Sequence, residues 1–187
     1  GLQVDTDAFM RGDYRLSSLT SPGSVINYGL INAATGGNVA LLGGEVANHG
    51  QIIANYGHVA LASGKQMVID FDGDGLIKFQ INEQIINNSS SSDNAVHNTG
   101  QITANSGQIV LEGKVAAGVF TNVVNNEGML RANTISSEGG VIRLQSSGRT
   151  LHSGTIDSTS TNADGGVVHI LGDQVGILGD ATIDASG

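Results

Sequence analysis

The sequence contains no cysteine and no tryptophan, and only one proline among its 187 residues. Without cysteine, the chain cannot use thiolate catalysis, cysteine-ligated metals or disulfide bonds. Charged residues make up only 13% of it, with a formal net charge of -9, and the eight lysines and arginines are scattered along the chain. This distribution predicts no surface for nucleic acid. No apolar run approaches the roughly 18 residues of a membrane-spanning helix, so membrane insertion is not expected either.

What the sequence has in abundance is glycine, with 28 residues, and one repeated pattern. The pattern reads apolar-x-Asn-x-Gly-x-Ile-x-Ala, then a short spacer, then Gly-x-Val-x-Leu. Its copies occupy residues 25–41, 46–61 and 96–111, followed by looser copies at 124–144, 150–170 and 177–185. The isoleucine position recurs at intervals of 21 to 28 residues, apart from one interval of 50. A repeat of this length indicates one structural unit that stacks on its neighbours.

Within each copy, apolar and polar residues alternate with period two, which is typical of half-buried β-strands. No stretch shows the i, i+3, i+4 spacing of a helix. Glycine, asparagine, aspartate and serine separate the strands and suit tight turns. We therefore predict an all-β fold, a parallel β-helix (β-solenoid) in which equivalent residues of successive coils lie one above another. Four asparagines in one repeat column are expected to form an amide ladder: Asn27, Asn48, Asn98 and Asn126.

The interval of 50 residues contains an insertion into the repeat. Apolar residues alternate over 67–71 and again over 77–81, on either side of Asp72-Gly73-Asp74-Gly75. This pattern predicts one inserted β-hairpin that leaves the β-helix and packs on its side. The predicted organisation is a lead-in segment or first irregular coil at 1–24, β-helix coils at 25–64, the inserted hairpin and a polar loop at 65–94, and further coils at 95–187. Longer spacers at 133–140 and 159–165 are expected to form loops at one shared corner.

These residues resemble the filamentous haemagglutinin family of adhesins, which are two-partner secretion exoproteins. The similarity lies in the repeats at 25–41, 46–61 and 96–111, in Ile69-Asp70-Phe71-Asp72-Gly73-Asp74-Gly75-Leu76, and in Phe9-Met10-Arg11-Gly12-Asp13-Tyr14-Arg15-Leu16. The last stretch resembles a segment that follows the secretion domain in this family, and the Asn-Pro-Asn motifs of that domain are absent. The resemblance therefore implies a segment after or at the end of the secretion domain. It also implies a right-handed β-helix, export through an outer-membrane transporter partner, and a role in adhesion or biofilm outside the cell.

Three carboxylates in the inserted hairpin suggest calcium. Asp70, Asp72 and Asp74, followed by Gly75, match the first half of an EF-hand loop. Carboxylates at this spacing around a glycine-enabled turn can converge on one Ca²⁺. The twelfth position of the loop, where an EF-hand has glutamate, is Ile81, and no helices flank it. A hairpin turn that needs only aspartate and glycine explains the same residues, so we favour the turn and expect no cofactor unless it is calcium.

Three further features of the sequence could carry binding or chemistry. Arg11-Gly12-Asp13 is an integrin-type tripeptide, but three residues arise easily by chance. The five histidines occupy different repeat columns, which predicts no stacked metal site. Asp157 and Asp184 occupy equivalent columns and should stack, and a glycosidase needs two neighbouring carboxylates. Because no nucleophile motif or basic cluster accompanies this pair, we assign no catalytic residue and predict that the chain is not an enzyme.

The sequence thus predicts a segment of a secreted bacterial adhesin, located outside the cell or on the bacterial cell surface, that mediates attachment or biofilm matrix contact. Binding is expected on the lateral faces, at the hairpin and loop of 65–94, and at the two corner loops. The expected ligands are host or matrix glycans, or other copies of the same chain. Two alternatives stay open: a polysaccharide-degrading enzyme on a β-helix scaffold, and a structural spacer without a ligand.

Overall fold

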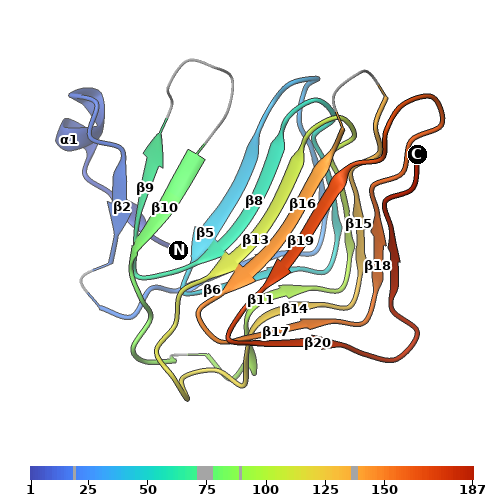
Figure 1. Cartoon of the computed structure of the whole chain (residues 1–187). Coiled ribbons are helices and arrows are strands. Elements are labelled where there is room, and N and C mark those ends of the chain that lie inside the picture. Colours follow the sequence, from blue (N-terminus) through green and yellow to red (C-terminus); the bar gives the residue numbers. More distant parts are fainter. Residues whose placement is uncertain (19, 71–77, 89, 136–138) are drawn as a thin grey trace.

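The structure is a computed structural model of the chain, and it describes residues 1–18, 20–70, 78–88, 90–135 and 139–187. In these ranges the regular secondary structure is almost entirely β-strand, and the strands form three parallel sheets and one antiparallel sheet (Figure 1). The expectation of an all-β protein with parallel sheets is confirmed. No helix in the part of the chain that the structure describes has the length and apolar character needed to cross a membrane.

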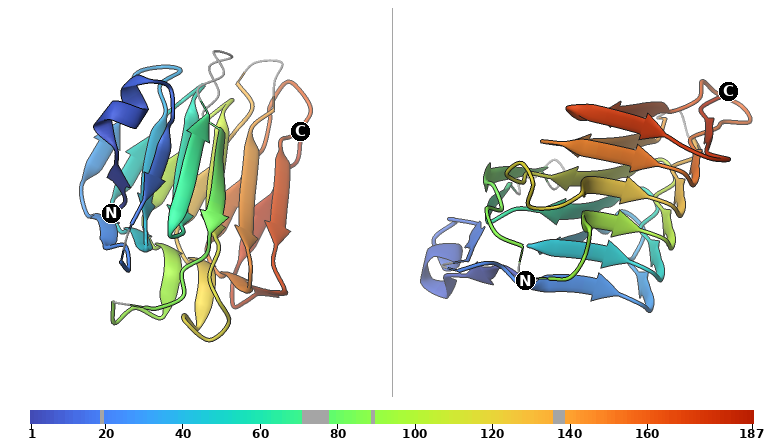
Figure 2. Two further views of the ribbon diagram at one scale, coloured as in Figure 1. Left: turned by 90° about the vertical axis from the view of Figure 1, so that its left-hand side faces the viewer. Right: turned by 90° about the horizontal axis from the view of Figure 1, so that it is seen from below.

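Each parallel sheet takes its strands from successive coils. The first sheet contains, in spatial order, β20 (Gln174–Ile177), β17 (Arg149–His152), β14 (Asn122–Asn126), β11 (Asn94–Asn98), β6 (Glu45–Asn48) and β3 (Ser24–Asn27). The second contains β21 (Thr182–Asp184), β18 (Thr155–Asp157), β15 (Met129–Arg131), β12 (Gln101–Thr103), β7 (Gln51–Ile53) and β4 (Leu30–Asn32). The third contains β19 (Val167–Leu171), β16 (Val141–Ser146), β13 (Gln108–Gly113), β8 (His58–Ser63) and β5 (Val39–Gly43). The chain visits the three sheets in turn, an arrangement consistent with a β-helix (Figure 2).

The register between coils follows the repeat. Ile52 of β7 pairs with Ile31 on one side and Ile102 on the other. The looser copies keep the same register, because Leu130 pairs with Ile102 and Ile156, and Ile156 pairs in turn with Ile183. The predicted stacking of equivalent positions is therefore confirmed, and the insertion of residues 65–94 does not disturb it.

The core lies between the three sheets. Its fully buried side chains come from the apolar repeat columns: Val46, Ile52, Ala54, Val59, Leu61, Val96, Ile102, Ala104, Ile109, Leu111, Val124, Leu130, Ala132, Ile142, Leu144 and Ile156. Burial of each large aliphatic side chain contributes about 1.5–3 kcal/mol. The equivalent residues of the first and last coils are more exposed, since each has a neighbouring coil on one side only.

The antiparallel sheet joins the lead-in segment to the insertion. Its spatial order is β1 (Gln3–Val4), β2 (Arg15–Ser17), β9 (Gln66–Asp70) and β10 (Lys78–Glu83). Strands β9 and β10 pair with each other, and β2 pairs with β9 through Arg15–Val68 and Leu16–Met67. Buried Met67 and Ile81 pack on Leu42 and Ala62, on the outer face of the third sheet. The sequence did not predict the pairing between the lead-in segment and the insertion.

A short helix, α1 (Thr6–Met10), connects β1 to β2 and corrects the expectation that the chain contains no helical segment. Its first turn is capped by Asp5, whose side chain accepts a hydrogen bond from the backbone N–H of Ala8 at 2.9 Å. A helix of five residues is too short to display a hydrophobic period, which explains why periodicity did not reveal it.

The connections between coils differ at the corners. Residues 132–140 and 158–166 both connect the second sheet to the third, and a bridge between Thr134 and Ser160 joins them. A separate apolar cluster formed by Ile85, Ala95, Val115 and Val123 lies at another corner, where Ile85 bridges to Val115. This second cluster was not predicted, because it combines Ile85 of the insertion and Val115 of a spacer with Ala95 of β11 and Val123 of β14, which lie just before the apolar repeat positions Val96 and Val124.

Candidate functional site

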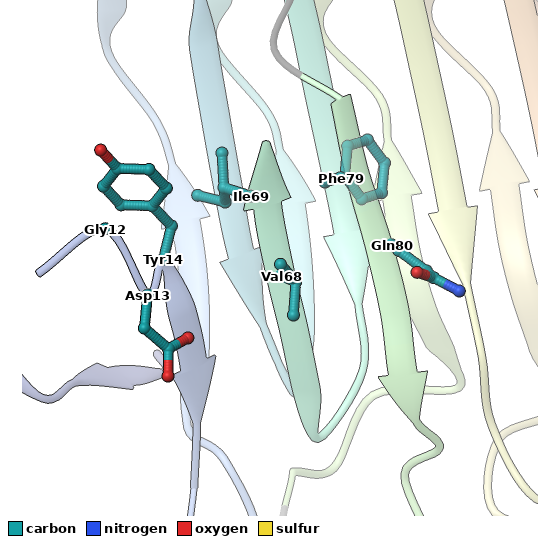
Figure 3. A pocket seen from close by; sticks show the side chains of 7 residues that line it. All are labelled: Gly12, Asp13, Tyr14, Val68, Ile69, Phe79 and Gln80. Carbon is teal, nitrogen blue, oxygen red and sulfur yellow. The ribbon is translucent and has the colours of Figure 1, made fainter. Parts of the chain in front are cut away.

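A cavity of about 390 Å³ lies where the lead-in segment meets the antiparallel pair β9–β10. We call it the junction pocket. Figure 3 shows the residues that line it: Gly12, Asp13, Tyr14, Val68, Ile69, Phe79 and Gln80. The rings of Tyr14 and Phe79 lie on opposite sides of the β9 side chains (Figure 3). The pocket therefore combines two aromatic rings with polar groups from two segments that are distant in the sequence.

Local structure explains why Asp13 and Tyr14 reach this position. Helix α1 ends at Met10, and Gly12 adopts a φ of +89°, a left-handed conformation that turns the chain towards β2. The ring of Tyr14 then packs edge-on against Phe9 at a centroid distance of 4.9 Å. Asp13 approaches Arg15 at 3.9 Å. The Arg11-Gly12-Asp13 tripeptide thus lies in an exposed turn, and its aspartate lines the junction pocket.

The junction pocket offers two aromatic rings, the amide of Gln80 and the carboxylate of Asp13 to a bound molecule. Aromatic rings and an amide provide an apolar face and hydrogen-bonding groups for a sugar ring or a protein side chain. The sequence identified both contributing stretches, 9–16 and 65–94, but it did not identify Tyr14, Phe79 and Gln80 as neighbours. The alternation of apolar residues over 67–71 and 77–81 indicated two strands. It did not indicate which residues of other segments lie beside them.

The residues expected to contact calcium are only partly placed. Asp72 and Asp74 lie outside the described residues, and Asp70 is the last residue of β9. Ile81, at the twelfth position of the EF-hand pattern, is 4% exposed and packs beside Met67 in the cluster under the antiparallel sheet. The position that would hold the EF-hand glutamate is therefore part of the hydrophobic packing of this sheet.

The four asparagines of the predicted ladder are in hydrogen-bond contact from coil to coil. The Nδ2 of Asn27 donates to the Oδ1 of Asn48 at 2.8 Å. Asn48 donates to Asn98 at 2.8 Å, and Asn98 donates to Asn126 at 2.7 Å. Each amide also donates to the backbone carbonyl two residues ahead, over 3.1–3.3 Å. The ladder is confirmed. It gives hydrogen-bond partners to the amides of Asn48, Asn98 and Asn126, whose side chains are fully buried.

His152 extends the asparagine ladder by one coil. It occupies the position equivalent to Asn126, and the Nδ2 of Asn126 lies 3.0 Å from its Nδ1. Because the ladder donates in one direction, Nδ1 acts as the acceptor, and the proton of the neutral ring is at Nε2, 3.4 Å from the carbonyl oxygen of Thr182. His152 is fully buried. Burial lowers its pKa below the usual value of 6.5, although carbonyl contacts with Thr182 and Asn126 favour the charged ring.

Acidification is expected to destabilise the protein through His152. The neutral ring is favoured in the folded state, so an unfolded chain binds a proton first as the pH falls through 6.5. The contribution of His152 to the free energy of unfolding is then complete above pH 6.5 and is lost progressively below it. Urea denaturation of the wild type and of His152→Asn at pH 7.5 and 5.5 measures this contribution.

The variant His152→Asn keeps an amide in the ladder and removes the titrating ring. We expect it to lose less stability than the wild type between the two pH values, since all other titrating groups are common to both proteins. An equal loss in the two proteins would contradict the assigned protonation of His152.

The two aspartates proposed for the enzyme alternative are in register on neighbouring strands, as the repeat predicted. Asp157 of β18 pairs in register with Asp184 of β21. Asp157 accepts hydrogen bonds from Arg131 Nε at 3.0 Å, Asn133 Nδ2 at 2.8 Å and Thr159 Oγ1 at 2.9 Å. Burial alone would raise the pKa of Asp157, but these hydrogen bonds outweigh it and hold the pKa below its usual value. An ionised Asp157 has no proton to give to a glycosidic oxygen.

The histidines are closer together than the repeat columns predicted. The rings of His49 and His97 are in edge-to-face contact at 5.8 Å, and Tyr28 stacks on His49 at 5.0 Å. His97 also contacts Glu127 at 3.1 Å. On this surface, side chains from neighbouring repeat columns of adjacent coils are in contact. Histidines in different columns can therefore lie close together. Across the described ranges no group of three His, Asp or Glu side chains is close enough to hold a metal ion.

Comparisons with known proteins identify a similar fold. No protein-family model matches the sequence, and no curated protein matches it. The crystal structure of the HMW1 secretion domain from Haemophilus influenzae is similar to this chain, with a TM-score of 0.67 and 20% sequence identity. The similarity covers 100% of this chain and 57% of the HMW1 chain, so this chain spans a little over half the length of its structural neighbour. At this level of identity, the likeness establishes a shared fold.

Proposed function

We propose that this chain is a segment of a secreted exoprotein of the two-partner type, related to filamentous haemagglutinin. In this proposal it is a right-handed β-helix that leaves the cell through an outer-membrane transporter partner and is exposed at the bacterial cell surface or released. The observation that carries the proposal is the similarity of the entire chain to a secretion domain. The repeats and the residues at 69–76 support it independently, because they resemble those of the same family.

The architecture suits export and contact for physical reasons. Each coil pairs with its direct neighbours in the stack, so the fold can be built coil by coil as the chain emerges. The absence of cysteine means that no disulfide can form in transit. The stacked coils expose long lateral faces, and the antiparallel sheet adds the junction pocket to one of them. We propose that these surfaces mediate attachment or biofilm contact by binding glycans or other copies of the chain.

Export can be tested with the parent exoprotein. Cells that carry it together with its outer-membrane transporter are expected to release the segment into the medium or display it on the surface. Cells without the transporter should retain it, as judged by an antibody against residues 1–187. Equal release with and without the transporter would contradict the proposal.

Adhesion can be tested with the 187-residue protein itself on a glycan array. We expect binding without chemical change of the glycan. Release of product from a polysaccharide, lost in Asp157→Asn, would instead support an enzyme. An absence of binding, self-association and turnover would support the structural spacer and contradict the proposed adhesive role.

A further inference from the structure

A second cavity, of about 360 Å³, follows the outer edge of β10, on the side away from β9. We call it the edge groove. Phe79, Gln80 and Ile81 of β10 form one wall. The remaining lining residues belong to the ends of β13 and β16 or follow them: Glu112, Gly113, Lys114, Gln145, Ser146 and Ser147. The groove therefore lies between the antiparallel sheet and the outer face of the third sheet.

Side-chain packing holds one wall of the groove in place, and sheet pairing holds the other. Ile81 is almost fully buried against Ala62, and Phe79 packs beside the same cluster, so β10 cannot move freely over the third sheet. On the other wall, Glu112 of β13 pairs in register with Gln145 of β16. Successive strands in a sheet lie about 4.8 Å apart, which places these two side chains side by side on one surface.

The polar groups in the groove are available to a ligand. Considering the described residues only, the side chains of Gln80, Glu112 and Gln145 make no hydrogen bond. Burial raises the pKa of Glu112 above its usual value of 4.5, while Arg143 and Lys114 partly offset this. The carboxyl group is thus partly desolvated, and within the described part of the chain no side chain or backbone group donates a hydrogen bond to it. Such groups gain most from a ligand that supplies hydroxyl donors.

Two kinds of ligand fit a groove beside an edge strand: an added peptide strand, or a small hydroxylated molecule. Strand addition needs the free backbone groups of β10. The Nζ of Lys114 donates to the carbonyl oxygen of Ile81 at 3.3 Å, so one of those groups already has a partner. Beyond it, the bridge between Ile85 and Val115 ties the chain that follows β10 to the β-helix. A lysine at a strand edge opposes strand addition, which favours the small ligand.

We propose that the edge groove binds a neutral saccharide unit. A sugar ring has an apolar C–H face, which can pack on Phe79, and adjacent hydroxyl groups, which can pair with Gln80, Glu112 and Gln145. The charge of Glu112 is compensated by two cations, Arg143 and Lys114, so a neutral ligand meets no uncompensated carboxylate in the groove. This inference rests on the proposed contact with glycans and gives that contact a location and a ligand class.

The test is a titration of the isotopically labelled 187-residue protein, followed by NMR, with maltotetraose, cellotetraose and the fully N-acetylated chitotetraose. At least one of these neutral sugars should shift the amide signals of Gln80, Glu112 and Gln145 in a saturable manner. Gln145→Ala and Glu112→Gln should weaken binding about tenfold, as expected for one lost hydrogen bond. Phe79→Leu keeps an apolar side chain in the packing and should also weaken binding, because the flat ring is lost.

The matched control is Gln174→Ala, which removes an exposed glutamine from β20 at the far end of the stack and should leave the affinity unchanged. Urea denaturation confirms that each variant is folded. Three results would overturn the proposal: no saturable shift with any neutral sugar, shifts only with trigalacturonate, or shifts in β10 only with an extended peptide copying β9. Array binding that survives Gln145→Ala, Glu112→Gln and Phe79→Leu would overturn the groove assignment and leave the proposed function standing. Sugar binding in the groove without transporter-dependent export would support the groove assignment and contradict the proposed function.

Discussion

Replacement of Gly100 by alanine is expected to lower the free energy of unfolding by roughly 3 kcal/mol, because there is no room for a side chain between the coils. A Cβ atom at this position would overlap the carbonyl oxygen of Gly50, in the coil before. Stacked backbones cannot move apart there without breaking the sheet pairing on both sides of the turn. Equilibrium denaturation in urea, monitored by circular dichroism, measures the change.

Gly29→Ala is the matched control, since Gly29 occupies the same repeat column in the first coil. The nearest atom to its added Cβ is Asn27 Oδ1 at 3.9 Å, an ordinary contact. We expect a change within about 0.5 kcal/mol. Similar losses in Gly29→Ala and Gly100→Ala would show that the glycine column serves backbone conformation alone and would contradict the packing explanation.

Asn98→Ala is the second substitution with a large expected effect, a loss of roughly 3 kcal/mol. Asn98 is fully buried in the middle of the ladder, where it accepts from Asn48 and donates to Asn126. Its removal leaves a buried amide donor on one side and a buried acceptor on the other, and each costs about 1–3 kcal/mol. The measurement is again the free energy of unfolding in urea.

Asn27→Ala provides the comparison, because Asn27 begins the ladder and is partly exposed. This substitution leaves one buried group without its ladder partner, the Oδ1 of Asn48, whereas Asn98→Ala leaves two, so we expect a smaller loss of about 1–2 kcal/mol. If Asn98→Ala costs no more than Asn27→Ala, the ladder does not contribute as a buried hydrogen-bonded column.

The repeat predicted the stacked part of the protein well, for a local reason. In a strand, successive side chains point to opposite faces of the sheet. A shift of the pairing register by one residue would therefore expose every side chain of the core column. Ile52 and Ile102 were therefore matched correctly although 50 residues separate them. The same logic placed Asn98 above Asn48 and Asp184 opposite Asp157.

The candidate site was predicted less well. The sequence indicated two strands around 67–81, and it indicated a distinct lead-in segment. It did not indicate that Arg15 pairs with Val68, or that Tyr14 and Phe79 line one pocket. Neither stretch has a sequence pattern that indicates the strand with which it pairs. Helix α1 is too short to show a hydrophobic period.

By itself, the sequence determined that the chain forms coils, which residues stack, and which amides form the ladder, because alternation and repetition are local properties that each coil expresses separately. Only the tertiary structure decided where the irregular segments pack. The positions of Tyr14 and Phe79 at the junction pocket, and of Phe79 beside Glu112 in the edge groove, depend on which edges and faces remain uncovered once the coils are stacked. That choice reflects the burial of Met67 and Ile81 on Leu42 and Ala62, a contact between remote segments that no local pattern encodes.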